Sequence, residues 1–214
     1  MAEGQAQNRF AFISGPDRIA QAIGRLGAER GTAVPILDGA ACRRLIEASK
    51  PLAFRPAKPV VGEGERIVRQ DFTICMEVPK ASLLGRLAES FGALCEEALD
   101  RLDPSPIERP FRFNDRVLQW YEPGSQGISS HRDHIRYVGL AALVVLTGRA
   151  RFCVCDDRDG AGAREIRAGP GDVILLRGPG YGGRRARPFH FLSDITERRL
   201  SFGLRHDLQK NANG

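Results

Sequence analysis

The back half of the chain constrains the fold most strongly, because from residue 111 onward it consists of short apolar or alternating segments separated by glycine and proline. Alternation of apolar and polar side chains is typical of a strand with one buried face, and glycine and proline mark the turns between strands. We therefore predict strands at residues 111–121, 127–131, 137–146, 151–155, 172–176, 189–193 and 198–206.

The front half is predicted to be mainly helical. Apolar residues recur at helical spacing over residues 16–30, and Asp38 is the expected cap of a second helix. Ser82 opens the clearest helix, which runs to residue 102 and whose apolar face we expect to pack on the strands. Residues 67–78 alternate as one further strand. The chain is thus predicted to be α+β and mainly β.

The length of 214 residues and the hydrophobic content of 42% allow one substantial core. We predict a single domain over residues 13–207, with a helical front at 13–110 and a core barrel at 111–207. Residues 1–12 and 208–214 are predicted to be flexible. The sequence has no apolar run of roughly 18 residues, so neither a membrane-spanning helix nor a membrane partner is expected.

The first residues show no basic stretch followed by an apolar one, so secretion is not expected. The five cysteines are then expected to be reduced thiols. Cys153 and Cys155 are interpreted as small buried apolar side chains. These features predict a cytoplasmic protein.

The segment His131–Asp133 and a later histidine, His190, supply residue types that bind metals. In an extended segment His131 and Asp133 point to the same side and Arg132 points away. Alone, such a pair is more often a polar strand end than a metal site. Together with His190 and two arginines further along, it predicts an Fe(II) centre with open positions for a co-substrate and O₂.

The segment 199–205 alternates strictly between two faces. One face carries leucine and phenylalanine, and the other carries Arg199, Ser201, Gly203 and Arg205. If this polar face pointed into a barrel, burying its arginines would cost free energy unless an anion paired with them. A dicarboxylate such as 2-oxoglutarate suits the planar fork of arginine, and the small Ser201 and Gly203 would leave room for it. An amphipathic edge strand with solvated arginines is the alternative.

The order of these motifs resembles the Fe(II)/2-oxoglutarate dioxygenases, and most nearly their AlkB-like branch. The segment 118–124 (LQWYEPG), followed by ISSH at 128–131, is similar to the segment that leads into the metal motif of that branch. The resemblance covers about residues 114–207, and its motifs are specific in combination. It implies a double-stranded β-helix, a jelly-roll or cupin-like barrel, with the N-terminal helices packed outside.

The resemblance also implies roles for individual residues. The iron ligands would be His131, Asp133 and His190. Arg199 would bind the distal carboxylate of 2-oxoglutarate, and Arg205 would lie near its 1-carboxylate. Tyr121, with Gln119, would hydrogen-bond the co-substrate from a neighbouring strand.

The chain departs from the AlkB-like pattern in places. Gln119 stands where the repair enzymes usually carry asparagine, and the spacing from Tyr121 to His131 is one residue longer than usual. The repair enzymes place an acidic residue after the metal motif to hold the damaged base, whereas residues 134–136 here contain no carboxylate. This departure disfavours base demethylation. Of the remaining histidines, His134 is expected in a loop or just behind the metal ligands, and His206 on the surface of the terminal strand.

The net charge of +6 permits a nucleic-acid partner without requiring one. The arginines near the metal motif are Arg132, Arg136, Arg184, Arg185 and Arg187. Either they ring the mouth of the barrel and favour an anionic substrate, or they lie in solvated loops. Trp120 is expected to pack in the core.

Three hypotheses about function follow. The leading one is an oxidoreductase, a dioxygenase that hydroxylates or oxidatively demethylates a small molecule or a protein side chain and produces succinate and CO₂. The second directs the same chemistry at alkylated nucleic acid. The third is a non-catalytic jelly-roll that binds a metal or a sugar as a sensor, and it leaves the inward arginines unexplained.

Overall fold

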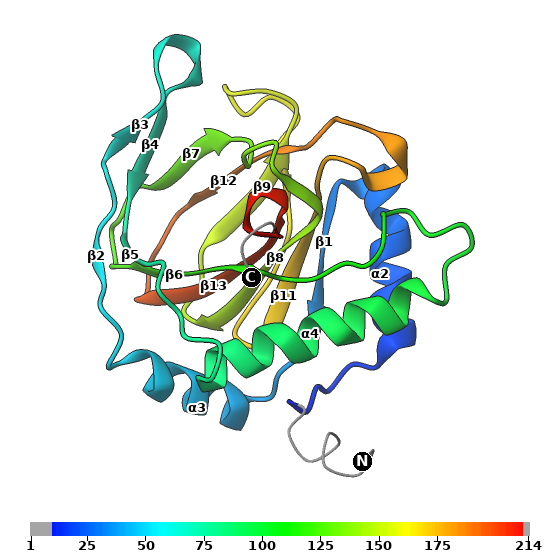
Figure 1. Ribbon diagram of the computed structural model, residues 1–214. Coiled ribbons are helices and arrows are strands. Elements are labelled where there is room, and N and C mark those ends of the chain that lie inside the picture. The colour runs from blue at the N-terminus through cyan, green and yellow to red at the C-terminus, as the bar shows by residue number, and fades with distance from the viewer. Residues whose placement is uncertain (1–9, 212–214) are drawn as a thin grey trace.

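The structure is a computed structural model that describes residues 10–211. Its strands form two antiparallel sheets, which together make a barrel (Figure 1). The seven-stranded sheet contains, in spatial order, β1 (Gly31–Pro35), β11 (Asp172–Arg177), β8 (Tyr137–Thr147), β13 (Arg199–Asp207), β6 (Asp115–Tyr121), β5 (Thr73–Cys75) and β2 (Arg55–Pro56). The six-stranded sheet contains β10 (Arg164–Glu165), β9 (Arg151–Cys155), β12 (Phe189–Ser193), β7 (Gly127–His131), β4 (Val68–Asp71) and β3 (Val60–Val61).

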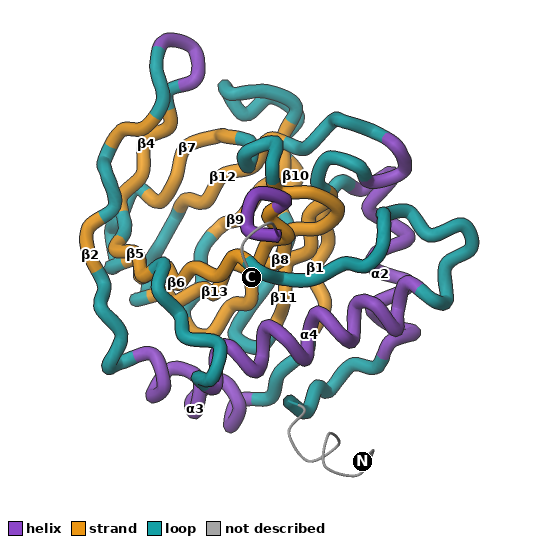
Figure 2. Tube along the Cα trace, in the orientation of Figure 1, coloured by secondary structure: helices purple, strands orange, loops and turns teal. Residues whose placement is uncertain are grey.

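The helices lie along one side of the barrel, outside the seven-stranded sheet (Figure 2). The α-helices of the described residues are α2 (Pro16–Glu29), α3 (Gly39–Ser49) and α4 (Leu83–Leu99). Short 3-10 turns lie at η1 (Gly64–Arg66), η2 (Tyr181–Gly183) and η3 (Leu208–Asn211). The caps predicted for α3 and α4 are confirmed: the side chain of Asp38 accepts a hydrogen bond from the Ala41 N–H at 2.7 Å, and that of Ser82 from the Gly85 N–H at 3.0 Å.

Apolar side chains form two cores, one on each face of the seven-stranded sheet. On the outer face Leu200, Phe202 and Leu204 of β13 are fully buried against the helices. Each such side chain contributes about 1.5–3 kcal/mol by leaving water. The second core lies inside the barrel and includes Tyr121 and Phe152. Because β13 alternates, this packing leaves its polar face toward the barrel interior.

Most predicted elements are confirmed, but residues 67–78 do not form one strand. The chain changes sheets at Phe72, so β4 pairs with β7 in one sheet and β5 pairs with β6 in the other. The predicted strand 111–121 begins only at Asp115, and the last helix ends at Leu99 instead of residue 102. Strand β1 was not predicted; it pairs with β11 at one edge of the seven-stranded sheet. The mainly helical front also supplies β2 and β5 to that sheet and β3 and β4 to the other, so it contributes strands to both sheets.

The predicted flexible ends are described only in part, because residues 1–9 and 212–214 lie outside the described residues. Phe10 and Phe12 pack against the outer core, and the Phe10 N–H donates a hydrogen bond to the Ser90 hydroxyl at 2.9 Å. At the other end Lys210 forms an ion pair with Asp115 at 2.5 Å. Within residues 10–211, no helix has both the length and the apolar character needed to span a bilayer.

Replacing Gly127 with alanine is expected to lower the free energy of unfolding by about 3 kcal/mol, through left-handed backbone strain and overpacking. Gly127 has φ of 72°, and a Cβ there would overlap the main-chain oxygen of Leu192 on the paired strand β12. Urea denaturation measures the loss. Gly124→Ala is the control, because Gly124 has φ of 81° but open space around the Cβ position. Equal losses in the two variants would contradict the clash.

Candidate metal centre and co-substrate pocket

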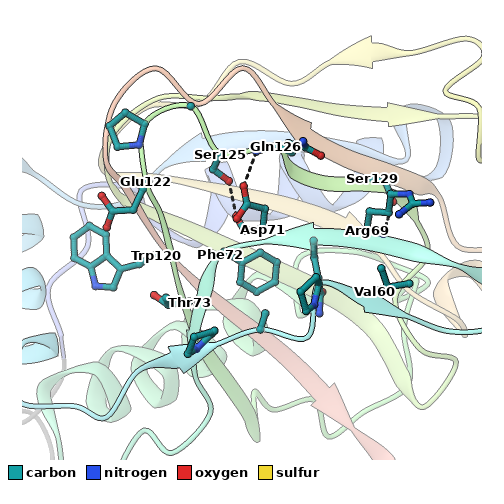
Figure 3. A pocket seen from close by; sticks show the side chains of 16 residues that line it. Val60, Arg69, Asp71, Phe72, Thr73, Trp120, Glu122, Ser125, Gln126 and Ser129 are labelled. Carbon is teal, nitrogen blue, oxygen red and sulfur yellow. Dashed lines mark hydrogen bonds between the residues drawn. The ribbon is translucent and has the colours of Figure 1, made fainter.

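One cavity of about 560 Å³ inside the barrel brings together all the residues that the sequence analysis selected. They are His131, Asp133, His190, Arg199, Arg205, Tyr121 and Gln119. A larger hollow of about 760 Å³ lies beside the strand crossing at Phe72 (Figure 3) and shares Gln70 and Phe72 with this cavity. The larger hollow contains none of the selected residues, so size alone does not identify the site.

His131, Asp133 and His190 form a cluster whose ligand atoms all lie within 4.8 Å of one another. The pairing of β7 with β12 creates it, because His131 and His190 are cross-strand partners and their ring centres lie 4.3 Å apart. Asp133 follows His131 by two residues, so it returns to the same side. Two imidazoles and one carboxylate on one side of a cavity are the donor set of a non-haem Fe(II) site with open positions.

Both imidazoles of the cluster are neutral. Burial, together with the neighbouring His190, lowers the pKa of His131 to about 3. Burial also lowers the pKa of His190. The Nδ1 of His131 lies 2.9 Å from the main-chain oxygen of Ser129, which suits a tautomer that donates there and leaves Nε2 free to bind a metal.

Arg205 forms an ion pair with the carboxylate of Asp133 through two hydrogen bonds. Its Nε and Nη2 donate to Oδ2 and Oδ1 at 3.0 and 3.3 Å. Burial raises the pKa of Asp133, but the charge of Arg205 and its hydrogen bonds to the carboxylate outweigh burial and hold that pKa below its ordinary range. The carboxylate is therefore ionised and fixed in orientation. Sequence reasoning assigned Arg205 to the co-substrate and missed this contact, which depends on the pairing of distant strands.

Arg199 is a buried cation without a counter-ion in the described part of the chain. Its side chain is only 2% exposed, and its one contact of note is with the ring of Tyr121, whose centre lies 5.7 Å from the guanidinium carbon. Burial lowers its pKa. Two residues along β13, the hydroxyl of Ser201 is buried with no hydrogen-bond partner among residues 10–211. A cation and a hydroxyl left unsatisfied side by side suit a carboxylate.

The sequence predicts for Ser201 only the role of a small residue that leaves room for the ligand. Its spacing of two residues from Arg199 was the available signal, since alternation places both side chains on one face. Tyr121 and Gln119 lie directly opposite these residues on β6, as the partners of Arg199 and Ser201. Burial raises the pKa of Tyr121 to about 12, so its phenol stays protonated and can donate a hydrogen bond.

Three further residue predictions have clear outcomes. The surface position predicted for His206 is wrong: the residue is buried, and its ring contacts Phe111 edge-on with centres 5.3 Å apart. Trp120 is half-buried against the outer core, as predicted. All five cysteines are buried and free of disulfides.

No protein-family model matches the sequence, and no curated protein matches it. Solved structures do match. A prolyl-4-hydroxylase from Pseudomonas putida is similar with a TM-score of 0.63 and 14% identity, over 88% of this chain and 98% of that one. A prolyl hydroxylase from Trichoplax adhaerens, in complex with a hypoxia-inducible-factor peptide, gives a TM-score of 0.64 and 11% identity, over 99% and 96% of the two chains. HygX from Streptomyces hygroscopicus, with nickel and 2-oxoglutarate bound, gives 0.56 and 14%, over 87% and 86%.

The chain has the double-stranded β-helix fold. The predicted fold class, mainly β with the N-terminal helices outside the barrel, is thereby confirmed. At these identities the comparison establishes the fold and leaves the activity to the residues of the site. The AlkB-like branch stays a prediction.

Proposed function

We propose that the protein is an Fe(II)- and 2-oxoglutarate-dependent dioxygenase that hydroxylates or oxidatively demethylates a C–H or N-methyl group. The observation that carries the proposal is one cavity that holds both the His131–Asp133–His190 cluster and Arg199, a cation with no counter-ion among residues 10–211. A metal-binding sensor would need the cluster but would gain nothing from a buried cation without a counter-ion. Such a cation costs free energy unless a ligand neutralises it.

The residues present fit the metal. His131 and His190 are neutral, Asp133 is ionised, and the three face the cavity from one side. When bound, Fe(II) with 2-oxoglutarate would supply O₂ activation, converting the co-substrate to succinate and CO₂ and delivering one oxygen atom to a substrate C–H bond. The protein's own part is to hold the ligand side chains, and Arg205 does this for Asp133.

The residues also fit the co-substrate. Arg199 offers a guanidinium and Ser201 a hydroxyl to its distal carboxylate, and neither group has another partner among residues 10–211. Tyr121 is protonated and borders the same pocket. Leu143, Phe152 and Leu192 complete the cavity wall with apolar surface, which limits the access of water to the reacting groups.

Alkylated nucleic acid is the second candidate substrate. Arg132 and Arg136 border the cavity, so a phosphate backbone could meet positive charge at its rim. Against it, the cavity's carboxylates already have partners: Arg205 holds Asp133, and Lys210 holds Asp115. A small molecule or a protein side chain therefore remains the leading substrate class.

An anaerobic titration with Fe(II) and then 2-oxoglutarate tests the proposal. We expect a visible charge-transfer band that needs both additions, followed by succinate formation when O₂ is admitted. Absence of the band from folded protein that binds iron would reject the dioxygenase and favour the metal-binding sensor. The band requires Fe(II) and the co-substrate but no substrate, so it can be measured before any substrate is found.

A further inference from the structure

Two arginines beside the metal cluster have no carboxylate partner among residues 10–211, and the proposed chemistry gives them no task. Arg132 is exposed, and its guanidinium carbon lies 3.9 Å from the centre of the Phe189 ring. Arg187 is half-buried, and its Nε donates a hydrogen bond to the main-chain oxygen of Asp133 at 2.6 Å. Both guanidiniums are thus held in place by contacts that leave their charge uncompensated.

The two arginines lie at the same corner of the barrel. Arg132 directly precedes Asp133, whose main chain Arg187 contacts, and it stacks on Phe189, the first residue of β12. The Asp133 carboxylate itself is held by Arg205. Two like charges so placed repel each other, and an oxyanion between them would remove that cost.

This corner differs in position and surroundings from the co-substrate pocket. Arg132 is an exposed residue at the rim of the cavity, whereas Arg199 is buried beside Tyr121. The lining of the cavity also includes apolar side chains, among them Val61 and Met76. An anion at the corner would therefore belong to a molecule entering the cavity, with apolar surface available for the rest of it.

We propose that Arg132 and Arg187 bind a phosphate group of the substrate at the rim of the cavity. This inference rests on the proposed function, because it assigns the anion to the molecule that the dioxygenase oxidises. A phosphate suits the corner better than a carboxylate does. One arginine can satisfy both oxygens of a carboxylate, whereas a tetrahedral phosphate offers oxygens to two guanidiniums that arrive from different segments.

Calorimetric titration with methyl phosphate, at constant ionic strength, tests the proposal on protein loaded with Ni(II) and 2-oxoglutarate. We expect binding by the unaltered protein and a loss of about tenfold or more in Arg132→Gln and in Arg187→Gln, as charge-assisted hydrogen bonds disappear. The matched control is Arg185→Gln, which removes an exposed charge from the same loop and should leave the affinity unchanged. Arg132→Gln is the decisive variant, since the Arg132 side chain stacks on Phe189 and, unlike that of Arg187, does not hydrogen-bond to the main chain of Asp133.

No binding by the unaltered protein, or equal losses in Arg132→Gln and Arg185→Gln, would overturn the inference. The two proposals fail separately: a missing charge-transfer band rejects the dioxygenase, whereas a normal band without methyl phosphate binding rejects only the phosphate site. A short thymidine oligonucleotide identifies the source of the phosphate. Arg132-dependent binding about 100-fold tighter than that of methyl phosphate would indicate a nucleic-acid backbone, and binding no tighter a small phosphorylated substrate. Both results support the site.

Discussion

Replacing His190 with alanine is expected to weaken Fe(II) binding by more than about 100-fold, because loss of a group that merely supports a metal ligand already costs 10–100-fold. The imidazole of His190 lies on β12 opposite His131, and His131 and Asp133 alone cannot complete the ligand set. Anaerobic Fe(II) titration followed by the charge-transfer band measures the effect. Turnover of 2-oxoglutarate to succinate should disappear with it.

His134→Ala is the control for this experiment. His134 follows the metal motif in the chain but is exposed and does not belong to the ligand cluster. We expect it to bind Fe(II) as the unaltered protein does. Full iron affinity in His190→Ala, or an equal loss in His134→Ala, would show that the metal binds elsewhere.

Replacing Arg199 with methionine is expected to have two opposite effects. The dissociation constant for 2-oxoglutarate should rise about 10–100-fold, since a hydrogen bond to a charged group is worth about 1.5–3 kcal/mol. The metal-free protein should instead become more stable, because the substitution removes a buried cation that has no counter-ion among residues 10–211. Titration of the charge-transfer band and urea denaturation measure the two effects.

Arg198→Met provides the matched control for Arg199→Met. The adjacent Arg198 is exposed, pairs with Glu122 at 3.0 Å and lies over the Trp120 ring, outside the cavity. It should leave 2-oxoglutarate affinity unchanged. A purely structural role for Arg199 would give lower stability with unchanged affinity, and that result would move the co-substrate anchor to another residue.

For Arg199 and Ser201, the sequence predicts which face of the strand they share but not which groups lie beside them. Alternation along one strand is a local property, so it correctly separated the apolar face of β13 from the polar one before any partner strand was known. The same reasoning could not tell that the Ser201 hydroxyl has no hydrogen-bond partner in the described part of the chain, because that depends on what β6 and β8 place beside it. Tyr121 and Gln119 were selected from the family resemblance, and their position opposite Arg199 and Ser201 came from the structure.

Helix caps and most strand ends could also be predicted from short stretches of sequence, since capping residues and turn formers act within a few residues of their own position. The largest failures involved contacts between distant segments. Residues 67–78 kept one alternating pattern through a change of sheet, because alternation reports which side of a strand is buried but not which neighbour it pairs with. His206 was misplaced for a similar reason: Phe111, which covers it, lies far away in the sequence.

The sequence by itself determined the residue types of the metal cluster, the two faces of β13 and the mainly β character of the back half, because these follow from side-chain chemistry and a period of two. Only the tertiary structure decided that His131 lies opposite His190, that Arg205 holds Asp133, and that Arg199 has no counter-ion within residues 10–211. The physical reason is that each of these depends on the register between strands that are distant in the chain. Register is set by the packing of whole sheets.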